Sequence, residues 1–61
     1  MRTSELTKIL NKSGCYKVHE GRNHEKWYSP KTNKFFIVPR HASKEVPTGT
    51  ANNILKAAGL K

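Results

Sequence analysis

The side chain best suited to chemistry in this sequence is the imidazole of His24. It stands three positions after the turn-forming Gly21 and two before Lys26. An imidazole accepts a proton readily near neutral pH, and neighbouring lysines and arginines disfavour its cationic form. In RNA the ribose 2′-hydroxyl can give up that proton, and its oxygen can then attack the adjacent phosphate without a metal. His24 is therefore our candidate general acid or base.

Positive and aromatic side chains near His24 are suited to holding RNA. The candidates are Arg22, Lys26, Tyr28 and Arg40. The cations would stabilise charge that develops on the phosphate, and a base can stack on Tyr28. Two alternatives stay open. A lone surface histidine is more often inert than catalytic, and Tyr28 can instead pair with Phe35 across two strands.

Metal and cofactor chemistry find little support. The spacings of Cys15 and the three histidines match no zinc motif, and the glycines are too dispersed to cradle a phosphate. We expect no metal and no cofactor, and we interpret Cys15 as a small buried hydrophobe. Either His19 or His41 can serve as a second acid that protonates the leaving 5′-oxygen, and both possibilities stay open.

The charge of the chain favours a polyanionic partner. Twelve Lys and Arg residues stand against four Asp and Glu, a net charge of +8. Nucleic acid is the commonest polyanion that such a protein meets. Excess charge also serves solubility in small proteins, which is the structural alternative.

Length and hydropathy indicate one small domain, residues 1–61. A chain of this size buries only about 60% of its unfolded surface, so its stability should be marginal. No apolar run reaches half of the roughly 20 residues that a membrane span needs, and the N-terminus lacks the apolar run of a signal peptide. With a single cysteine, the sequence predicts a reduced cytoplasmic protein that makes no membrane contact.

Two amphipathic helices are expected near the ends of the chain. Their apolar stripes are Leu6, Ile9 and Leu10 in the first and Ala51, Ile54, Leu55 and Ala58 in the second. Thr3 and Ser4 can cap the first helix, Glu5 suits its positive end, and Gly14 can terminate it.

The second helix has its own start and stop signals. Thr48 or Thr50 introduces it, and Gly59 ends it. If Gly59 lies just past the C-cap, Leu60 should meet Leu55 in a Schellman ending.

Three strands are expected between the helices, where aromatic and β-branched residues gather. The breaks fall at residues 21–22 and 30–33. A glycine followed by any residue favours a two-residue type II′ hairpin turn, which would pair Glu20 with Asn23 and His19 with His24. A four-residue loop at 30–33 would join the second and third strands.

This register assigns the strand residues to two faces. The face covered by the helices would carry Tyr16, Val18, Glu25, Trp27, Phe36 and Val38. The open face would carry Lys17, His19, His24, Lys26, Tyr28, Phe35 and Ile37. A slip of one residue would invert both faces. The fold predicted is α+β, in the order α-β-β-β-α, with a three-stranded antiparallel sheet and both helices on one face.

Five segments together resemble the HicA-type mRNA interferase toxins. They are Ser4-Glu5-Leu6, Gly14-Cys15-Tyr16, Gly21-Arg22-Asn23-His24, Val38-Pro39-Arg40-His41 and Pro47-Thr48-Gly49-Thr50. The resemblance covers almost the whole chain. It implies a fold similar to a double-stranded-RNA-binding domain, with His24 in the position of the family's catalytic histidine. His41 matches the Pro-x-His position, where RNA or structural contact is expected.

The resemblance also implies an activity and a protein partner, and this sequence departs from the family at two positions. The expected function is cleavage of mRNA by a metal-independent endoribonuclease, which a HicB-type antitoxin neutralises by covering His24. Arg22 stands where the family often has serine, and Cys15 where it often has an aromatic residue. Two rival functions stay open: a non-catalytic double-stranded-RNA-binding module, and an interaction protein whose charge serves only to dock an acidic partner.

Overall fold

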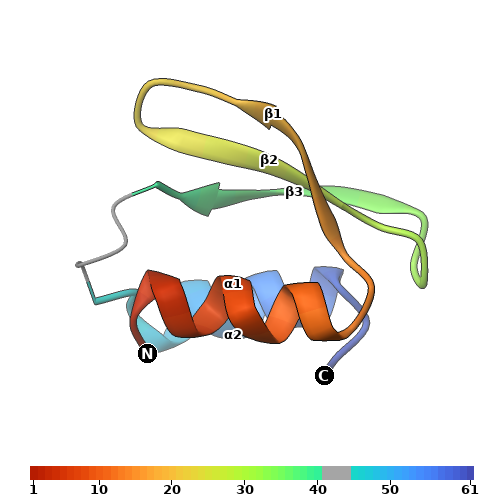
Figure 1. The fold of residues 1–61 in the computed structure, drawn as a ribbon. Coiled ribbons are helices and arrows are strands. Elements are labelled where there is room, and N and C mark those ends of the chain that lie inside the picture. The colour runs from red at the N-terminus through yellow and green to blue at the C-terminus, as the bar shows by residue number, and fades with distance from the viewer. Residues whose placement is uncertain (41–44) are drawn as a thin grey trace.

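The computed structural model describes residues 1–40 and 45–61, which form two helices and three strands. In chain order these are α1 (Thr3–Lys12), β1 (Tyr16–Glu20), β2 (His24–Ser29), β3 (Lys34–Pro39) and α2 (Thr48–Ala57). The strands form one antiparallel sheet in the order β1-β2-β3. Both helices lie on the same side of this sheet and run in the same direction (Figure 1). The predicted α-β-β-β-α order and α+β class are confirmed.

The helix starts differ from the predicted caps. The N-cap of α1 is Arg2, whose backbone N–H donates to the Glu5 carboxylate at 3.1 Å. The helix begins earlier than a Thr3 or Ser4 cap would require, so the prediction that Thr3 or Ser4 caps it was wrong. α2 begins at Thr48, one of its two predicted starts; its N-cap is Pro47, and no side chain among the described residues caps this helix.

The helix ends follow the prediction closely. Gly14 and Gly59 have φ angles of +95° and +84°, a region that side chains disfavour and glycine tolerates. The residue after each glycine donates its N–H to a carbonyl five positions earlier. These bonds join Cys15 to Leu10 at 3.0 Å and Leu60 to Leu55 at 2.8 Å. Both helices thus end in Schellman motifs.

The hydrophobic core fills the space between the sheet and the two helices. Its buried members are Leu6, Leu10, Cys15, Trp27, Phe36, Val38, Val46, Ala51, Ile54, Leu55 and Ala58. Helix spacing places the α1 and α2 members on one stripe each, and alternation places the strand members on one sheet face. The burial predicted for Cys15 and for Trp27, Phe36 and Val38 is confirmed.

Side chains of the β2–β3 hairpin bind the last turn of α2. The buried Ser29 hydroxyl donates to the Ala58 carbonyl at 2.9 Å, and the Thr32 hydroxyl donates to the Ala57 carbonyl at 2.6 Å. These bonds satisfy carbonyls that a helix end leaves without a partner. No helix in the described part of the chain is long and apolar enough to cross a membrane.

The β2–β3 register agrees with the prediction. Ser29 pairs with Lys34, which leaves residues 30–33 as a four-residue loop. In this register Tyr28 lies opposite Phe35 and Trp27 opposite Phe36. Exposed and buried residues alternate along both strands. This alternation made the β2–β3 register predictable from the sequence.

The predicted β1–β2 register was wrong. Glu20 pairs with Glu25 rather than Asn23, and the Gly21 N–H donates to the His24 carbonyl at 2.8 Å. The hairpin tip is therefore Arg22-Asn23, one residue later than predicted. The register shifts again between Lys17 and His19 at a β-bulge.

The bulge exchanges the faces of Tyr16, Lys17 and Val18, whereas His19 keeps its predicted place on the open face. Tyr16 and Val18, expected in the core, are 49% and 45% exposed and lie on the open face. Lys17, expected on the open face, pairs with Trp27 and lies on the helix side. Every residue of β1 is exposed, so burial exerts no force that could have fixed its register.

Candidate functional site

His24 lies at the start of β2, where the β1–β2 turn ends. The residue is exposed and pairs with Pro39 at the end of β3. Its imidazole lies over Gly21, because a methyl group added at Gly21 would be 3.6 Å from the His24 Nε2 atom. The predicted position, exposed and beside the end of the third strand, is confirmed.

The turn before His24 is bonded to Arg40, the first residue after β3. The Arg40 backbone N–H donates to the Asn23 carbonyl at 3.2 Å. Its guanidinium donates from Nη1 to the Gly21 carbonyl at 2.8 Å and from Nη2 to the Glu20 carboxylate at 2.6 Å. Arg40 thus contacts the turn at three points, although the sequence suggested only an RNA contact for it.

Substitution of Gly21 by alanine should displace His24. The added methyl group would lie 2.9 Å from the His24 carbonyl oxygen, a backbone atom that can move only if the turn shifts. We expect Gly21→Ala to lower at least 10-fold any RNA cleavage that depends on His24, since misplacement of a reacting group by about 1 Å can cost 10²-fold. Gly49→Ala is the matched control, because a methyl group there meets nothing within 4 Å. Equal cleavage by the two variants would contradict this expectation.

Three candidate residues lie at alternate positions of β2. His24, Lys26 and Tyr28 project from the open face, and each step of two residues covers about 6.7 Å. The Lys26 ammonium lies 4.8 Å from the centre of the Phe35 ring on the neighbouring strand. His19 pairs with Lys26 from the other side, so it shares this face. The structure therefore brings an imidazole, a cation and an aromatic ring into one row.

An aromatic ladder crosses all three strands on the open face. The Tyr16 and Tyr28 rings are 5.6 Å apart between centres, and Tyr28 and Phe35 are 4.9 Å apart. With Val18 and Asn33 these rings line a shallow groove of about 390 Å³. The predicted Tyr28–Phe35 pair is present. Tyr16 was not among the predicted site residues, because the predicted β1 register placed it in the core.

The remaining candidates lie outside this row. Arg22 is exposed at the hairpin tip, two residues from His24. His41 lies outside the described residues, so its predicted role stays a prediction. No group of three or more metal-ligating side chains was found among residues 1–40 and 45–61.

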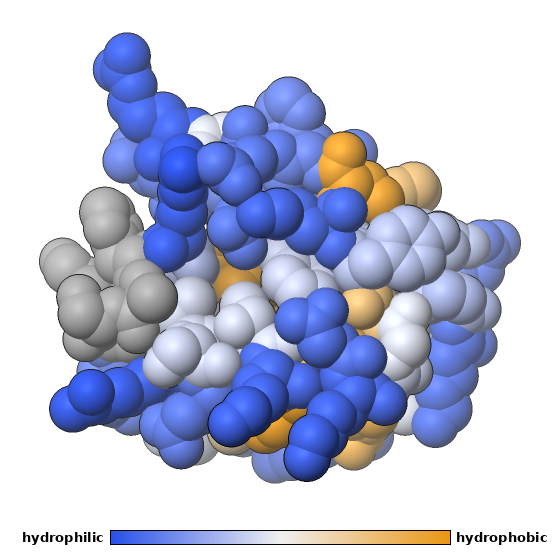
Figure 2. Space-filling model, viewed as in Figure 1, coloured by the Kyte–Doolittle hydropathy of each residue, from blue (hydrophilic) through white to orange (hydrophobic). Residues whose placement is uncertain are grey.

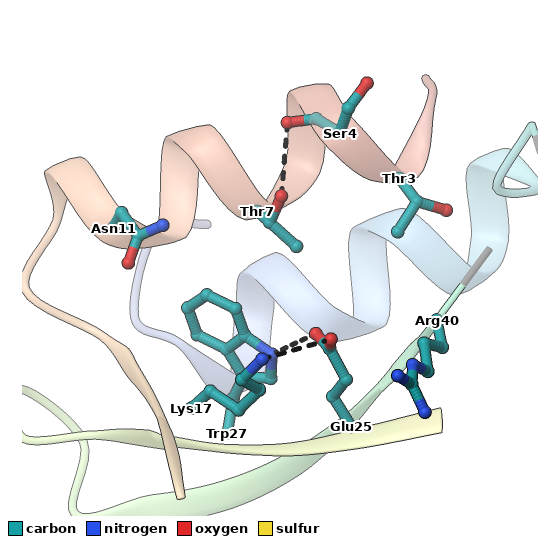
Figure 3. Close-up of a pocket in the computed structure, with 8 residues that line it drawn as sticks. All are labelled: Thr3, Ser4, Thr7, Asn11, Lys17, Glu25, Trp27 and Arg40. Carbon is teal, nitrogen blue, oxygen red and sulfur yellow. Dashed lines mark hydrogen bonds and ion pairs between the residues drawn. The ribbon is translucent and has the colours of Figure 1, made fainter. Parts of the chain in front are cut away.

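A second, polar cleft lies between α1 and the sheet (Figure 3). It has a volume of about 220 Å³ and is lined by Thr3, Ser4, Thr7, Asn11, Lys17, Glu25, Trp27 and Arg40. The Glu25 side chain is only 15% exposed and accepts hydrogen bonds from the Trp27 Nε1 at 3.1 Å and the Lys17 Nζ at 3.5 Å. This cleft was not predicted from the sequence, because the predicted β1 register placed Lys17 on the opposite face.

The charges at this end of the sheet balance one another. Lys17 donates to the Glu20 carboxylate at 2.7 Å, and Arg40 reaches the same carboxylate from the other side. The hydrogen bond from Lys17 and the positive charge of Arg40 lower the pKa of Glu20 below its ordinary value of 4.5. The hydrogen bond to Glu20 likewise raises the pKa of Lys17. Two cations and two carboxylates therefore form a neutral cluster, the Lys17–Glu20–Glu25–Arg40 cluster.

The lowered pKa of Glu20 predicts a small pH dependence of stability. A carboxyl whose folded-state pKa is depressed stabilises the fold above its unfolded pKa, and this contribution disappears as the pH falls through the folded-state value. We expect the wild type to melt at a higher temperature than Glu20→Gln at pH 6, with the difference shrinking below pH 4.5. Thermal melts followed by circular dichroism between pH 6 and pH 3 measure it. A difference that grows with acid would contradict the assignment.

The face of the molecule seen in Figure 2 is mostly polar. Hydrophobic residues appear on this face only in small separate patches. Because the Lys17–Glu20–Glu25–Arg40 cluster is neutral, the net charge of +8 comes from the other residues of the chain. Fold, charge and histidine together define a small, basic α-β-β-β-α protein whose candidate site lies on a hairpin at one end of its sheet.

Comparison with known families shows which family the chain belongs to. The family model described as HicA toxin of bacterial toxin-antitoxin matches residues 3–60. The chain therefore belongs to the HicA toxin family, whose members are toxins that act opposite an antitoxin partner. Comparison with curated proteins and with solved structures gave no match.

Proposed function

We propose that this HicA-family chain is an mRNA interferase, a metal-independent endoribonuclease that uses His24 as general acid or base. The observation that carries the proposal is the exposed imidazole of His24 on the same sheet face as Lys26 and Tyr28. Family membership supports a toxin, and the net charge of +8 supports a polyanionic substrate.

The chemistry needs only groups that RNA and this chain supply. A His24 ring nitrogen takes the proton of a ribose 2′-hydroxyl, and the 2′-oxygen attacks the adjacent phosphorus. A new P–O2′ bond forms, the P–O5′ bond breaks, and the products are a 2′,3′-cyclic phosphate and a 5′-hydroxyl. The leaving oxygen takes a proton from the His24 imidazolium or from a second acid, for which His19 and His41 remain candidates.

Cations and rings on the same side of the hairpin hold the RNA in this proposal. Arg22 at the tip and Lys26 on the strand stabilise negative charge on the attacked phosphate. An unpaired base stacks on Tyr28, at about 1–3 kcal/mol per stacked base. The ladder formed with Tyr16 and Phe35 offers neighbouring bases the same support.

The antitoxin in this proposal is a HicB-type protein that covers His24 and the cationic face around it. An acidic partner would associate quickly with a chain of charge +8, because opposite charges steer the encounter. Toxin, antitoxin and mRNA would meet in the cytoplasm.

A cleavage assay tests the function directly. The purified protein is incubated with an end-labelled mRNA in the presence of a metal chelator, and products are resolved on a gel. We expect cleavage that the chelator does not reduce and that added antitoxin stops. RNA that is bound with a steep salt dependence but recovered intact would favour a double-stranded-RNA-binding module. Saturable binding of an acidic protein without affinity for RNA would favour an interaction protein.

A further inference from the structure

We propose that Arg40 is a positioning residue that, together with Glu20, fixes the turn carrying His24. This inference rests on the proposed role of His24. In it, Arg40 acts through the turn rather than by gripping RNA. It also explains why an arginine that follows β3 reaches back to the end of β1.

The three bonds of Arg40 all end within one short segment. They reach Glu20, Gly21 and Asn23, the residues that lead into His24. β1 and β3 are not neighbours in the sheet, because β2 lies between them. The Arg40 side chain therefore crosses the end of β2 and joins the two outer strands around the first residue of that strand.

The β1–β2 hairpin depends on the Arg40 bonds for a fixed position more than the rest of the sheet does. Every residue of β1 is exposed, and its pairing with β2 is interrupted by a bulge. Arg22 and Asn23 at the tip are exposed as well. Catalytic geometry must be held within about 0.5 Å. Among residues 1–40 and 45–61, the side-chain bonds that tie this tip to the rest of the fold come from Arg40.

The chemistry of the guanidinium suits this position. Its rigid planar fork holds two separate acceptors at once, here a backbone carbonyl at 2.8 Å and a carboxylate at 2.6 Å. A lysine carries the same charge but presents a single ammonium on a flexible stem, and cannot reproduce the fork. Glu20 is held from its other side by Lys17 at 2.7 Å, so the acceptor of the second bond is itself fixed.

The charge balance supports positioning over RNA contact. Arg40 and Lys17 are matched by Glu20 and Glu25 within hydrogen-bonding or ion-pairing distance. A phosphate approaching Arg40 would meet these carboxylates as well. Lys26, by contrast, lies over the Phe35 ring on the open face and forms no ion pair with a carboxylate among the described residues.

The test compares Arg40→Lys and Glu20→Ala with Lys8→Gln, an exposed α1 variant remote from the turn. Each variant is first shown to be folded by its circular dichroism melt. We expect Arg40→Lys to bind RNA within twofold of the wild type, since its charge is kept, while its single-turnover cleavage rate at saturating RNA falls 10- to 100-fold. Glu20→Ala should lower the rate in the same direction, and the double variant should be no slower than Arg40→Lys alone. Lys8→Gln should keep the wild-type rate.

A spectroscopic measurement separates this inference from the nuclease proposal. The His24 ring signals in a carbon–proton NMR spectrum report the position of the imidazole whether or not RNA is cut. We expect these signals to shift or broaden in Arg40→Lys and Glu20→Ala but not in Lys8→Gln. Unchanged His24 signals, effects that multiply in the double variant, or weakened RNA binding at an unchanged rate would each overturn the positioning role. Shifted signals in a protein that cuts no RNA would uphold it and refute only the nuclease.

Discussion

His24→Ala should abolish RNA cleavage while leaving RNA binding intact. We expect the single-turnover rate to fall by about 10²- to 10⁴-fold, the usual contribution of a positioned general acid or base. The exposed position of His24 means that its removal creates no cavity, so the fold should survive. Rates at saturating RNA and dissociation constants, measured with chelator present, provide the comparison.

Cells offer a second measurement of the same variant. Induction of the wild type should stop growth and deplete messenger RNA, whereas His24→Ala should be tolerated at equal expression. His19→Ala in parallel shows whether the second imidazole on the open face assists. Persistent toxicity of the His24 variant, or a cleavage rate within threefold of the wild type, would remove His24 from the mechanism.

Leu10→Ala should leave most of the free protein unfolded. Leu10 has no exposed area, and truncation of a buried leucine costs about 2–5 kcal/mol. A core in a domain this small rarely supplies more than about 3–5 kcal/mol of net stability. The expected loss is therefore comparable with the entire free energy of unfolding. Urea unfolding followed by tryptophan fluorescence measures it, since Trp27 lies in the same core.

The neighbouring Ile9 gives the matched control for this prediction. It sits on the same helix but is 37% exposed, so Ile9→Ala should change stability by no more than about 0.5 kcal/mol. The antitoxin should partly restore the fold of Leu10→Ala, because a ligand that binds only the folded state stabilises it by mass action. Equal midpoints for the two variants would show that the interface between α1 and the sheet contributes little.

Local signals explain which parts of the fold were predictable. Gly14 and Gly59 end their helices by a backbone preference that needs no tertiary partner, and both predictions are confirmed. The β2–β3 register was also predictable, because Trp27, Phe36 and Val38 share one buried face. In both cases a short stretch of sequence contains the whole physical cause.

No local signal in the sequence fixes the register of β1. Both faces of the strand are exposed, so Tyr16 and Lys17 could exchange faces at no cost in burial. What fixes them is contact with distant residues: Tyr16 packs on Tyr28, and Lys17 bonds to Glu25. The bulge that accommodates both contacts leaves no mark in the hydrophobic pattern.

Some features of the candidate site were predictable from the sequence and others were not. The position of His24 followed from its place beside a turn, and its exposure is confirmed. The bonds from Arg40 to Glu20 and Gly21 span 20 and 19 positions of the chain and join segments that are not adjacent in the sheet. Spacing along the chain cannot indicate such a contact, which is why the sequence suggested only a surface cation.

The bulged outer strand has a consequence for a toxin released from its antitoxin. β1 forms one edge of the sheet, and an unpaired edge invites other chains to add strands and aggregate. Here the edge is five residues long, is distorted in the middle, and carries the Lys17 ammonium. Short length, irregular backbone and charge are the devices by which natural sheets resist such growth. The features of β1 that made its register hard to predict therefore also help to keep the free toxin from aggregating.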